Sequence, residues 1–136
     1  MKSGKQRREE IMQRRRERAA KFVNFDPHLR RPRVPLGVLE ADRELLARHN
    51  NTCGCLPLYY VDREFTCRDC GSHEVWTAKQ QKWWYEVALG NINSTAVRCR
   101  PCRRADQARS ADARRVSEEG MRRKLLAQAG KAGTDR

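Results

Sequence analysis

Apolar positions gather in the middle of the chain, where short runs alternate with polar turns. The run Leu-Tyr-Tyr-Val at 58–61 predicts a strand. After the polar residues 62–64, Phe65-Thr66 leads into Cys67-Arg-Asp-Cys70-Gly71, and Glu74-Val75-Trp76 leads away from it. A strand, a tight cysteine turn and a second strand predict a hairpin closed over a metal ion.

A helix is predicted directly after this hairpin, over Ala78–Leu89. Thr77 and Gln80 have the spacing of a capping box at its start. Trp83 and Trp84 are neighbours in this helix, so they cannot both face the core. We therefore expect core packing for most aromatic residues of this region, and one exposed tryptophan that is able to stack on a nucleotide base.

The flanking segments carry weaker patterns. Three prolines predict an extended linker over 22–36, with Phe22 and Phe25 as its anchors. A short apolar face predicts a helix over Val38–His49. Residues 94–98, Ser-Thr-Ala-Val-Arg, predict a strand that returns to a second cysteine pair.

Both ends of the chain consist of good helix formers with narrow apolar faces. Only four residues of 2–21 are apolar, so we expect a frayed helix that orders on a partner, or a solvated arm. Residues 105–129 predict a solvent-exposed helix interrupted by Gly120, and 130–136 predict a flexible tail.

Composition indicates one small domain with tails. Of 136 residues, 38% are hydrophobic and 35% are charged, a balance at which part of the chain buries little apolar surface. We expect a basic arm at 1–21, a linker with a short helix at 22–57, a zinc domain at 58–104, and a basic helical or flexible tail at 105–136.

The positive charge lies at the two ends. The formal net charge is +13, of which residues 1–21 contribute +6 and 98–136 contribute +7, whereas 22–97 are neutral. Cationic ends on a neutral body suit a polyanion, because Lys and Arg gain affinity by releasing counterions from phosphates. Solubilising tails without a binding role are the alternative interpretation.

Four cysteines carry the clearest chemistry. Two Cys-x-x-Cys pairs, Cys67/Cys70 and Cys99/Cys102, have the residue type and spacing of a tetrahedral structural zinc site, with iron as the alternative metal. The 28 residues between the pairs exceed the spacing of about 15–20 in simple ribbons, and the inserted helix accounts for the difference. The predicted fold is a small α+β zinc ribbon, with β-hairpin knuckles and an inserted helix, flanked by basic, largely helical or disordered arms.

Cys53 and Cys55 remain outside this set. Their Cys-x-Cys spacing admits two thiols, partial or alternative zinc ligation, or a redox pair. His73 also has a position from which it could ligate the metal, although four cysteines already complete the site.

The cysteine usage favours a reducing compartment, the cytoplasm. The sequence contains no run of 18 apolar residues and its charged beginning has no apolar segment of a secretory signal. We therefore expect no association with a membrane.

Three runs carry a resemblance to a known family: Asp-x-x-Phe-x-Cys-x-Asp-Cys-Gly at 62–71, Thr-Ala-x-x-Gln at 77–81 and Arg-Cys-x-x-Cys-Arg at 98–103. Over about residues 59–104 the chain resembles a family of small bacterial proteins described as probable zinc-ribbon domains. The resemblance implies the fold and one structural zinc ion held by Cys67, Cys70, Cys99 and Cys102. It implies no biochemical activity.

The charge pattern leads us to expect a zinc protein that binds nucleic acid, RNA or a ribosomal particle rather than DNA. Guanidinium groups suit bidentate contact with phosphate. The candidate contacts are Arg98, Arg100, Arg103 and Arg104, the arm residues Arg14, Arg15 and Arg16, and Trp83.

A protein-interaction adaptor with an acidic partner is the alternative. We expect no enzyme, because a four-cysteine site leaves no coordination position for water and the sequence contains no phosphate loop or nucleophile signature.

Overall fold

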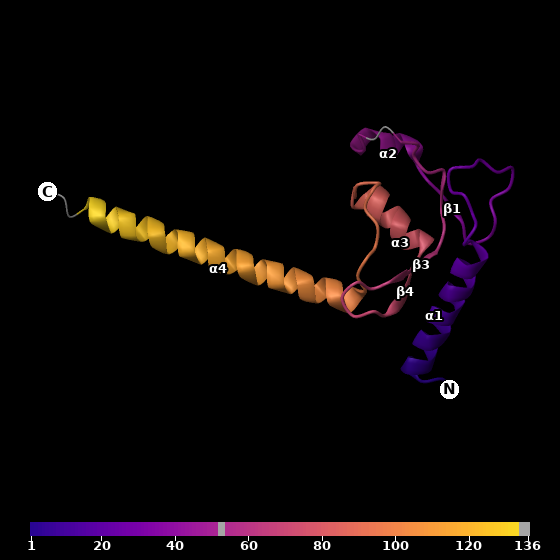
Figure 1. Cartoon of the computed structure of the whole chain (residues 1–136), viewed down its shortest axis with the longest axis horizontal. Coiled ribbons are helices and arrows are strands. Elements are labelled where there is room, and N and C mark those ends of the chain that lie inside the picture. Colours follow the sequence, from indigo (N-terminus) through magenta and orange to yellow (C-terminus); the bar gives the residue numbers. More distant parts are fainter. Residues whose placement is uncertain (52–53, 134–136) are drawn as a thin grey trace. The chain divides into compact units, whose positions relative to one another are not determined.

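The structure is a computed structural model that describes residues 1–51 and 54–133. It has two compact units, Met1–Val97 and Arg98–Arg136. The elements of the first unit are α1 (Gly4–Lys21), β1 (Leu39–Glu40), α2 (Arg43–His49), β2 (Tyr59–Tyr60), β3 (Arg63–Thr66), β4 (His73–Trp76), α3 (Ala78–Lys82) and the π-helical turn η1 (Trp83–Val87) (Figure 1). The second unit contains α4 (Arg100–Ala132).

Two antiparallel hairpins organise the first unit. β1 pairs with β2, and β3 pairs with β4 in a register that places Arg63 opposite Trp76 and Thr66 opposite His73. The predicted hairpin around the first cysteine pair is therefore confirmed, although β3 begins within the stretch expected as a polar link. The strand predicted at 58–61 is confirmed as β2, which pairs with β1 in a separate sheet.

The core consists of two apolar clusters, and adjacent tyrosines of β2 supply one ring to each. Tyr59 packs with Phe25, Val38 and Val61, and Tyr60 packs in the other cluster, with Leu46, Ala78 and Tyr85. Successive side chains of a strand point to opposite faces, so one short strand serves both clusters. Both predicted phenylalanine anchors are confirmed: the ring centroid of Phe25 lies 5.9 Å from that of Tyr59, and Phe22 packs against the same cluster.

The helix predicted over Val38–His49 is shorter than expected. Only Arg43–His49 is helical, because the Asp42 carboxylate accepts a hydrogen bond from Leu45 N (3.2 Å) and caps the helix start. Leu39–Glu40 instead form β1.

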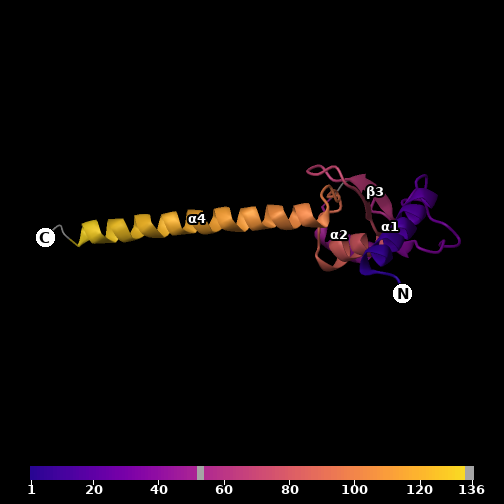
Figure 2. The same cartoon turned by 90° about the horizontal axis from the view of Figure 1, so that it is seen from below.

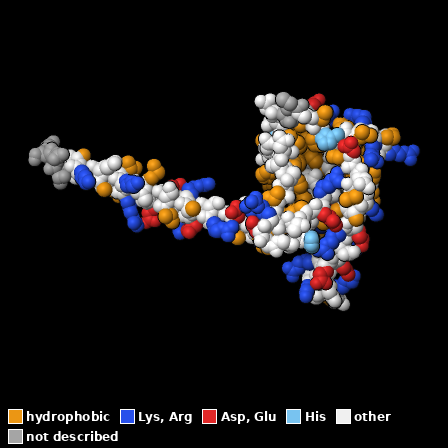
Figure 3. All heavy atoms as spheres, in the orientation of Figure 1, with side chains coloured by type: hydrophobic (Ala, Val, Ile, Leu, Met, Phe, Trp, Pro, Cys, Tyr) orange, Lys and Arg blue, Asp and Glu red, His pale blue; other side chains and the backbone are white. Residues whose placement is uncertain are grey.

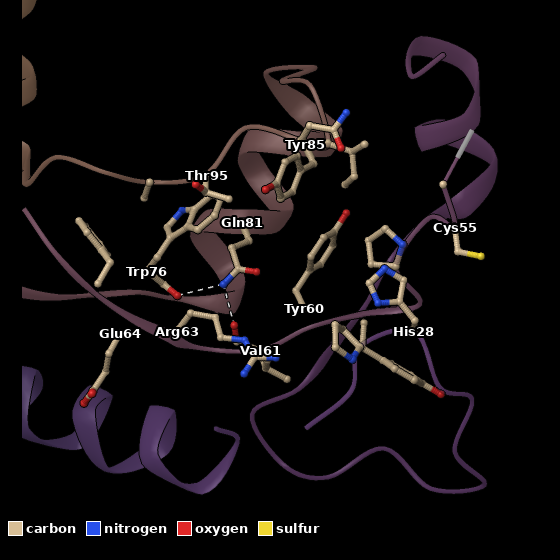
Figure 4. A pocket seen from close by; sticks show the side chains of 18 residues that line it. His28, Cys55, Tyr60, Val61, Arg63, Glu64, Trp76, Gln81, Tyr85 and Thr95 are labelled. Atoms are coloured by element: carbon tan, nitrogen blue, oxygen red, sulfur yellow. Dashed lines mark hydrogen bonds between the residues drawn. The ribbon is translucent and has the colours of Figure 1, made fainter. Parts of the chain in front are cut away.

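A buried amide and a buried carboxylate connect the second hairpin to α3. The Gln81 side chain donates to the carbonyl oxygens of Val61 (2.6 Å) and Trp76 (3.0 Å) (Figure 4). Asp62 Oδ1 accepts from Ala78 N (2.8 Å), one of the backbone donors that a helix start leaves unpaired. These bonds fix the hairpin that carries Cys67 and Cys70.

α1 is an ordered helix docked on its own fold, which corrects the expectation of a frayed arm that orders on a partner. Ala19 is only 3% exposed, and Arg18 Nε lies 3.0 Å from Asp62 Oδ2. The Arg63 guanidinium donates to the carbonyl oxygen of Phe22 (2.9 Å), just after the end of α1, and to that of Phe25 (2.8 Å), three residues further on. α1 lies beside the β3–β4 hairpin in both views (Figures 1 and 2).

α4 continues without interruption for 33 residues, and none of them is buried. The helix passes through Gly120 and reaches Ala132 (Figures 1 and 2). The predicted break at Gly120 is therefore wrong. The prediction of a flexible tail is also wrong for residues 130–132, which are helical. The last three residues of that predicted tail, 134–136, lie outside the described part of the chain.

Within residues 1–51 and 54–133, no helix is both long enough and apolar enough to cross a membrane.

Candidate metal centre

The first cysteine pair lies on the turn between β3 and β4. Cys67 N donates to Ser72 O (2.9 Å) and Gly71 N donates to Cys67 O (2.9 Å), which closes the turn. Gly71 has a φ of +74°, in the left-handed region that an L side chain rarely adopts. The Cys-x-x-Cys-Gly sequence therefore places Cys67 and Cys70 on a tight knuckle with its glycine where the backbone requires one.

The second pair opens a helix. Cys99 is the N-cap of α4, and Cys102 is the third residue of the helix. Pro101 fits in this first turn, where a missing N–H costs no intrahelical hydrogen bond. The positive end of the helix macrodipole favours thiolates at these positions.

The strand predicted at 94–98 is absent from the structure, which corrects that expectation. The Val97 carbonyl accepts one hydrogen bond, from Arg68 N (2.9 Å), and residues 94–98 form no ladder with another strand. One knuckle is thus built on a hairpin and the other cysteine pair on a helix start.

The ligand atoms of Cys67, Cys70, Cys99 and Cys102 all lie within 4.8 Å of one another. Zinc–sulfur bonds of about 2.3 Å in a tetrahedron place the sulfurs roughly 3.8 Å apart, so the group has the size of a zinc site. Its all-sulfur donor set is also the one that structural zinc takes. The cluster is consistent with one structural Zn²⁺.

The surroundings of the sulfurs distinguish a ligand from a bystander. Ser72 Oγ lies 3.2 Å from Cys70 Sγ, a distance at which the hydroxyl can donate to a metal-bound thiolate and orient it. His73 Nδ1 instead lies 3.3 Å from Thr66 Oγ1, and His73 is not part of the metal-holding group. Ser72 was not among the predicted site residues, although its place directly after the Cys-Gly turn is a usable signal.

Of the two cysteines outside the Cys-x-x-Cys pairs, only Cys55 lies in the described part of the chain. Cys55 is exposed and is not a member of the metal-holding group. Cys53 lies outside the described residues, so the three interpretations of the Cys-x-Cys pair stay as predictions.

The candidate arginines next to the second pair lie at the start of α4. Arg100, Arg103 and Arg104 are exposed, whereas Arg98, just before the helix, is half-buried. Exposure leaves the guanidinium groups of these three helix residues accessible to a ligand.

Both neighbouring tryptophans are exposed, in contrast to the one that we expected. Trp83 is 58% exposed and Trp84 39%. Trp84 is nevertheless held, because its indole N–H donates to Ser94 Oγ (2.9 Å) and its ring occupies the space where a Cβ on Gly90 would stand. Trp83 is therefore the ring with more surface available for stacking.

The π-helical turn η1 accounts for the exposure of both Trp83 and Trp84. Ala88 N donates to Trp83 O, five residues back (2.9 Å), and this wider turn replaces the regular helix that the capping box predicted as far as Leu89. No periodicity signal announces such a change, although the following Leu89 has a φ of +57° that marks the end of the helix.

The three candidate arginines of α1 have different surroundings. Arg14 is exposed and Arg15 is half-buried. Arg16 lines a surface hollow together with Glu64 and Glu74 of the β3–β4 hairpin, so its charge faces carboxylates of its own fold. Arg14 and Arg16 are thus the two exposed arginines of this set.

A larger hollow in the first unit, of about 560 Å³, is bordered by the rings of Tyr60, Trp76 and Tyr85 (Figure 4). Burial raises the pKa of Tyr85 to about 12, and its neutral hydroxyl donates to Ser94 O (2.5 Å). Burial, assisted by the nearby Glu86 carboxylate, also raises the pKa of Tyr60. A tyrosine is already neutral near pH 7, so these shifts only reflect how deeply the two phenols are buried beside the hollow.

Residues 61–111 match the family model described as a probable treble clef domain. No curated protein and no solved structure matches the chain. The matched span contains the β3–β4 knuckle, α3, and the start of α4 with the second cysteine pair. The family match, the knuckle and the four-cysteine cluster agree on a small zinc domain of the treble clef type over residues 61–111.

Proposed function

We propose that this zinc protein binds nucleic acid, with RNA preferred over DNA, in the reducing cytoplasm and without catalysing a reaction. The observation that carries the proposal is the placement of the charge. The whole net charge of +13 comes from residues 1–21 and 98–136, and α4, which holds most of the second group, has no buried residue. Exposed Lys and Arg gain affinity for phosphates through counterion release.

The preference for RNA rests on Trp83. Sequence-specific RNA recognition usually involves unpaired bases that stack on aromatic side chains. Trp83 presents an exposed indole on a helix that also carries Lys79. This ring supports a contact with unpaired bases, beside the phosphate contacts of the arms.

Zinc has a structural role in this proposal. A metal ion with four thiolate ligands supplies folding energy and leaves no coordination position for a reacting water. The zinc-holding residues join the knuckle turn and the first turn of α4 in one site, and the binding surface begins at Arg100 and Arg103, directly beside the second cysteine pair.

Fluorescence anisotropy with labelled RNA and DNA, at about 50 and 200 mM salt, tests the proposal. If about five phosphates are contacted, affinity should fall roughly 100-fold between these salt concentrations for a single strand and roughly 500-fold for a duplex. Trp83→Ala should weaken binding to unstructured RNA by about 1–3 kcal/mol and have a smaller effect on a duplex. Lack of binding at the lower salt concentration, or binding that does not depend on salt, would show that the proposal is wrong.

A protein-interaction adaptor is the second candidate function, and exposed apolar side chains around η1 favour it. Val87 is 68% exposed and Leu89 55%, next to the exposed Trp83. A purified complex with an acidic protein that survives nuclease treatment and is lost in Val87→Glu would support this function. A complex that nuclease dissolves would instead support nucleic-acid binding.

A further inference from the structure

The basic residues of α4 differ in whether a carboxylate of the same helix already neutralises them. Three ion pairs form within the helix, Arg109 with Asp106, Arg115 with Asp112, and Arg123 with Glu119. Each is an i, i+3 or i, i+4 pair. The charge of these three arginines is therefore offset locally.

Five further arginines of α4 are exposed and have no ion pair or side-chain hydrogen bond among the described residues. They are Arg100, Arg103, Arg104, Arg114 and Arg122. An α-helix turns by about 100° per residue, and at this angle the five Cα positions fall within an arc of roughly 100°. We call this row the arginine stripe.

The stripe is long and straight. Arg122 lies 22 positions after Arg100, which at about 1.5 Å per residue is roughly 33 Å along the axis. The carboxylates of Asp106, Asp112 and Glu119 fall outside the arc, and Glu118 falls inside it. Basic and acidic side chains share the visible surface of α4 (Figure 3). The three ion pairs identify the arginines that are neutralised within the helix, and the stripe consists of the others.

We propose that the arginine stripe is the face on which α4 binds the phosphodiester backbone of a nucleic acid. The proposal rests on the proposed function and adds which residues of the helix make the contacts. An unpaired guanidinium can bind a phosphate in a bidentate manner at once, whereas Arg109, Arg115 and Arg123 must first release a carboxylate. The helix already holds the five Cα positions in one row, so little backbone freedom is lost on binding.

Two charge-matched variants of the full zinc-loaded chain test the stripe. Arg104→Gln/Arg114→Gln/Arg122→Gln removes three stripe charges, and Arg109→Gln/Arg115→Gln/Arg123→Gln removes three paired charges. Both keep the second cysteine pair and its adjacent Arg103, and glutamine is a good helix former. Zinc content and circular dichroism at 222 nm establish that each variant is folded.

Anisotropy titrations use an RNA hairpin and an unstructured RNA of equal length. The stripe variant should lose about 100-fold in affinity at 50 mM salt, and the slope of log K against log salt should become shallower by about 2, the value for three lost phosphate contacts. The paired-side variant should lose less than about threefold. The RNA on which the stripe variant loses more affinity identifies whether a stem or a single strand supplies the phosphates.

The possible failures are distinguishable. If the unmodified chain binds neither RNA, both the proposed function and the stripe are wrong. If it binds and the two triple variants lose the same affinity, nucleic-acid binding stands, the contacts depend on total charge alone, and the stripe is wrong.

Discussion

α1 and α4 are two basic helices of similar composition with different surroundings. α1 buries Ala19 and pairs Arg18 with the buried Asp62, whereas α4 buries none of its 33 residues. Neither helix has the wide apolar stripe with which a helix normally packs on a core. Composition therefore does not distinguish the docked helix from the exposed one.

The difference arises from polar contacts at one end of α1. The Arg63 guanidinium bonds the carbonyl oxygens of Phe22, Val23 and Phe25 at and after the helix end, and Arg18 reaches Asp62 one turn before it. These carbonyls belong to the C-cap and to the turn that follows it, where the helix supplies no i+4 N–H donor, so the guanidinium holds the chain at the point where it leaves α1. A few charge-assisted bonds at a helix terminus replace an apolar face.

The largest effect should come from the metal, on which both helices depend. Cys102→Ser removes a ligand that is also a first-turn residue of α4, and α1 lies on the hairpin that carries the other cysteine pair. We expect loss of zinc and a fall of more than about 5 kcal/mol in the free energy of unfolding of residues 61–111, because structural zinc supplies much of the folding energy of small sites. Metal analysis and thermal unfolding measure this.

Cys55→Ser is the matched control, since Cys55 is exposed and is not part of the cluster. It should keep the full zinc content and the same unfolding midpoint. A Cys102→Ser protein that keeps one zinc ion and an unchanged midpoint would contradict the ligand assignment.

Asp62→Ala should destabilise α1 and leave α4 unchanged. Asp62 is 3% exposed and accepts from both Arg18 Nε and Ala78 N, so its removal leaves a donor of α3 without a partner and undocks the end of α1. We expect a loss of about 1.5–3 kcal/mol, the range for a hydrogen bond to a charged group. Hydrogen exchange should speed up in residues 4–21 and stay unchanged in 100–132.

Arg18→Gln provides the comparison for that experiment. It removes the contact with α1 and leaves the bond from Ala78 N to Asp62, so the loss should be smaller than for Asp62→Ala. Equal losses in the two variants would show that the bond to α3 contributes nothing.

Ser3→Ala should weaken the free end of α1. Ser3 Oγ accepts from Gln6 N (3.2 Å) and the Gln6 side chain accepts from Ser3 N (2.9 Å), a complete capping box. Loss of such a cap costs about 1 kcal/mol of helix stability. Hydrogen exchange should show faster opening in the first turns of α1 and none of this effect near Ala19, where the helix is docked.

The smallest effect should be a gain in α4. A Cβ on Gly120 would meet no atom within 4 Å, and glycine in an exposed helix interior costs about 0.5–1 kcal/mol relative to alanine. Gly120→Ala should therefore raise helicity and slow hydrogen exchange in the middle of α4. A loss of helicity would indicate that the centre of α4 is not a regular helix in solution.

Local patterns predicted the elements with strong signals. The cysteine spacing identified the four cysteines of the cluster, and the Thr77–Gln80 capping box is present with both of its hydrogen bonds. Each cysteine pair, taken alone, and the capping box are short-range signals, because their residues lie within four positions of each other along the chain.

Several of the failures have a long-range cause. The docking of α1 depends on Arg18 and Asp62, which are 44 residues apart, and no periodicity in residues 2–21 reports such a contact. The predicted return strand at 94–98 had suitable residues, but a strand needs a partner, and no ladder partner is present for it in the described residues. The pairing of β1 with β2 is likewise long-range, because it joins Leu39 to Tyr60 and Glu40 to Tyr59.

Because Cys99 is the N-cap of α4, the metal fixes the rotational phase of every residue that follows in the helix. One residue inserted between Arg104 and Arg114 would turn the distal half of the stripe by about 100° and end its alignment with the proximal half. Insertions of seven or eleven residues change the phase by only about 20°. Relatives in which the stripe binds phosphate should therefore carry insertions of seven or eleven residues in this part of α4, and few of other lengths. The lengths of these insertions would then indicate whether the stripe is under selection.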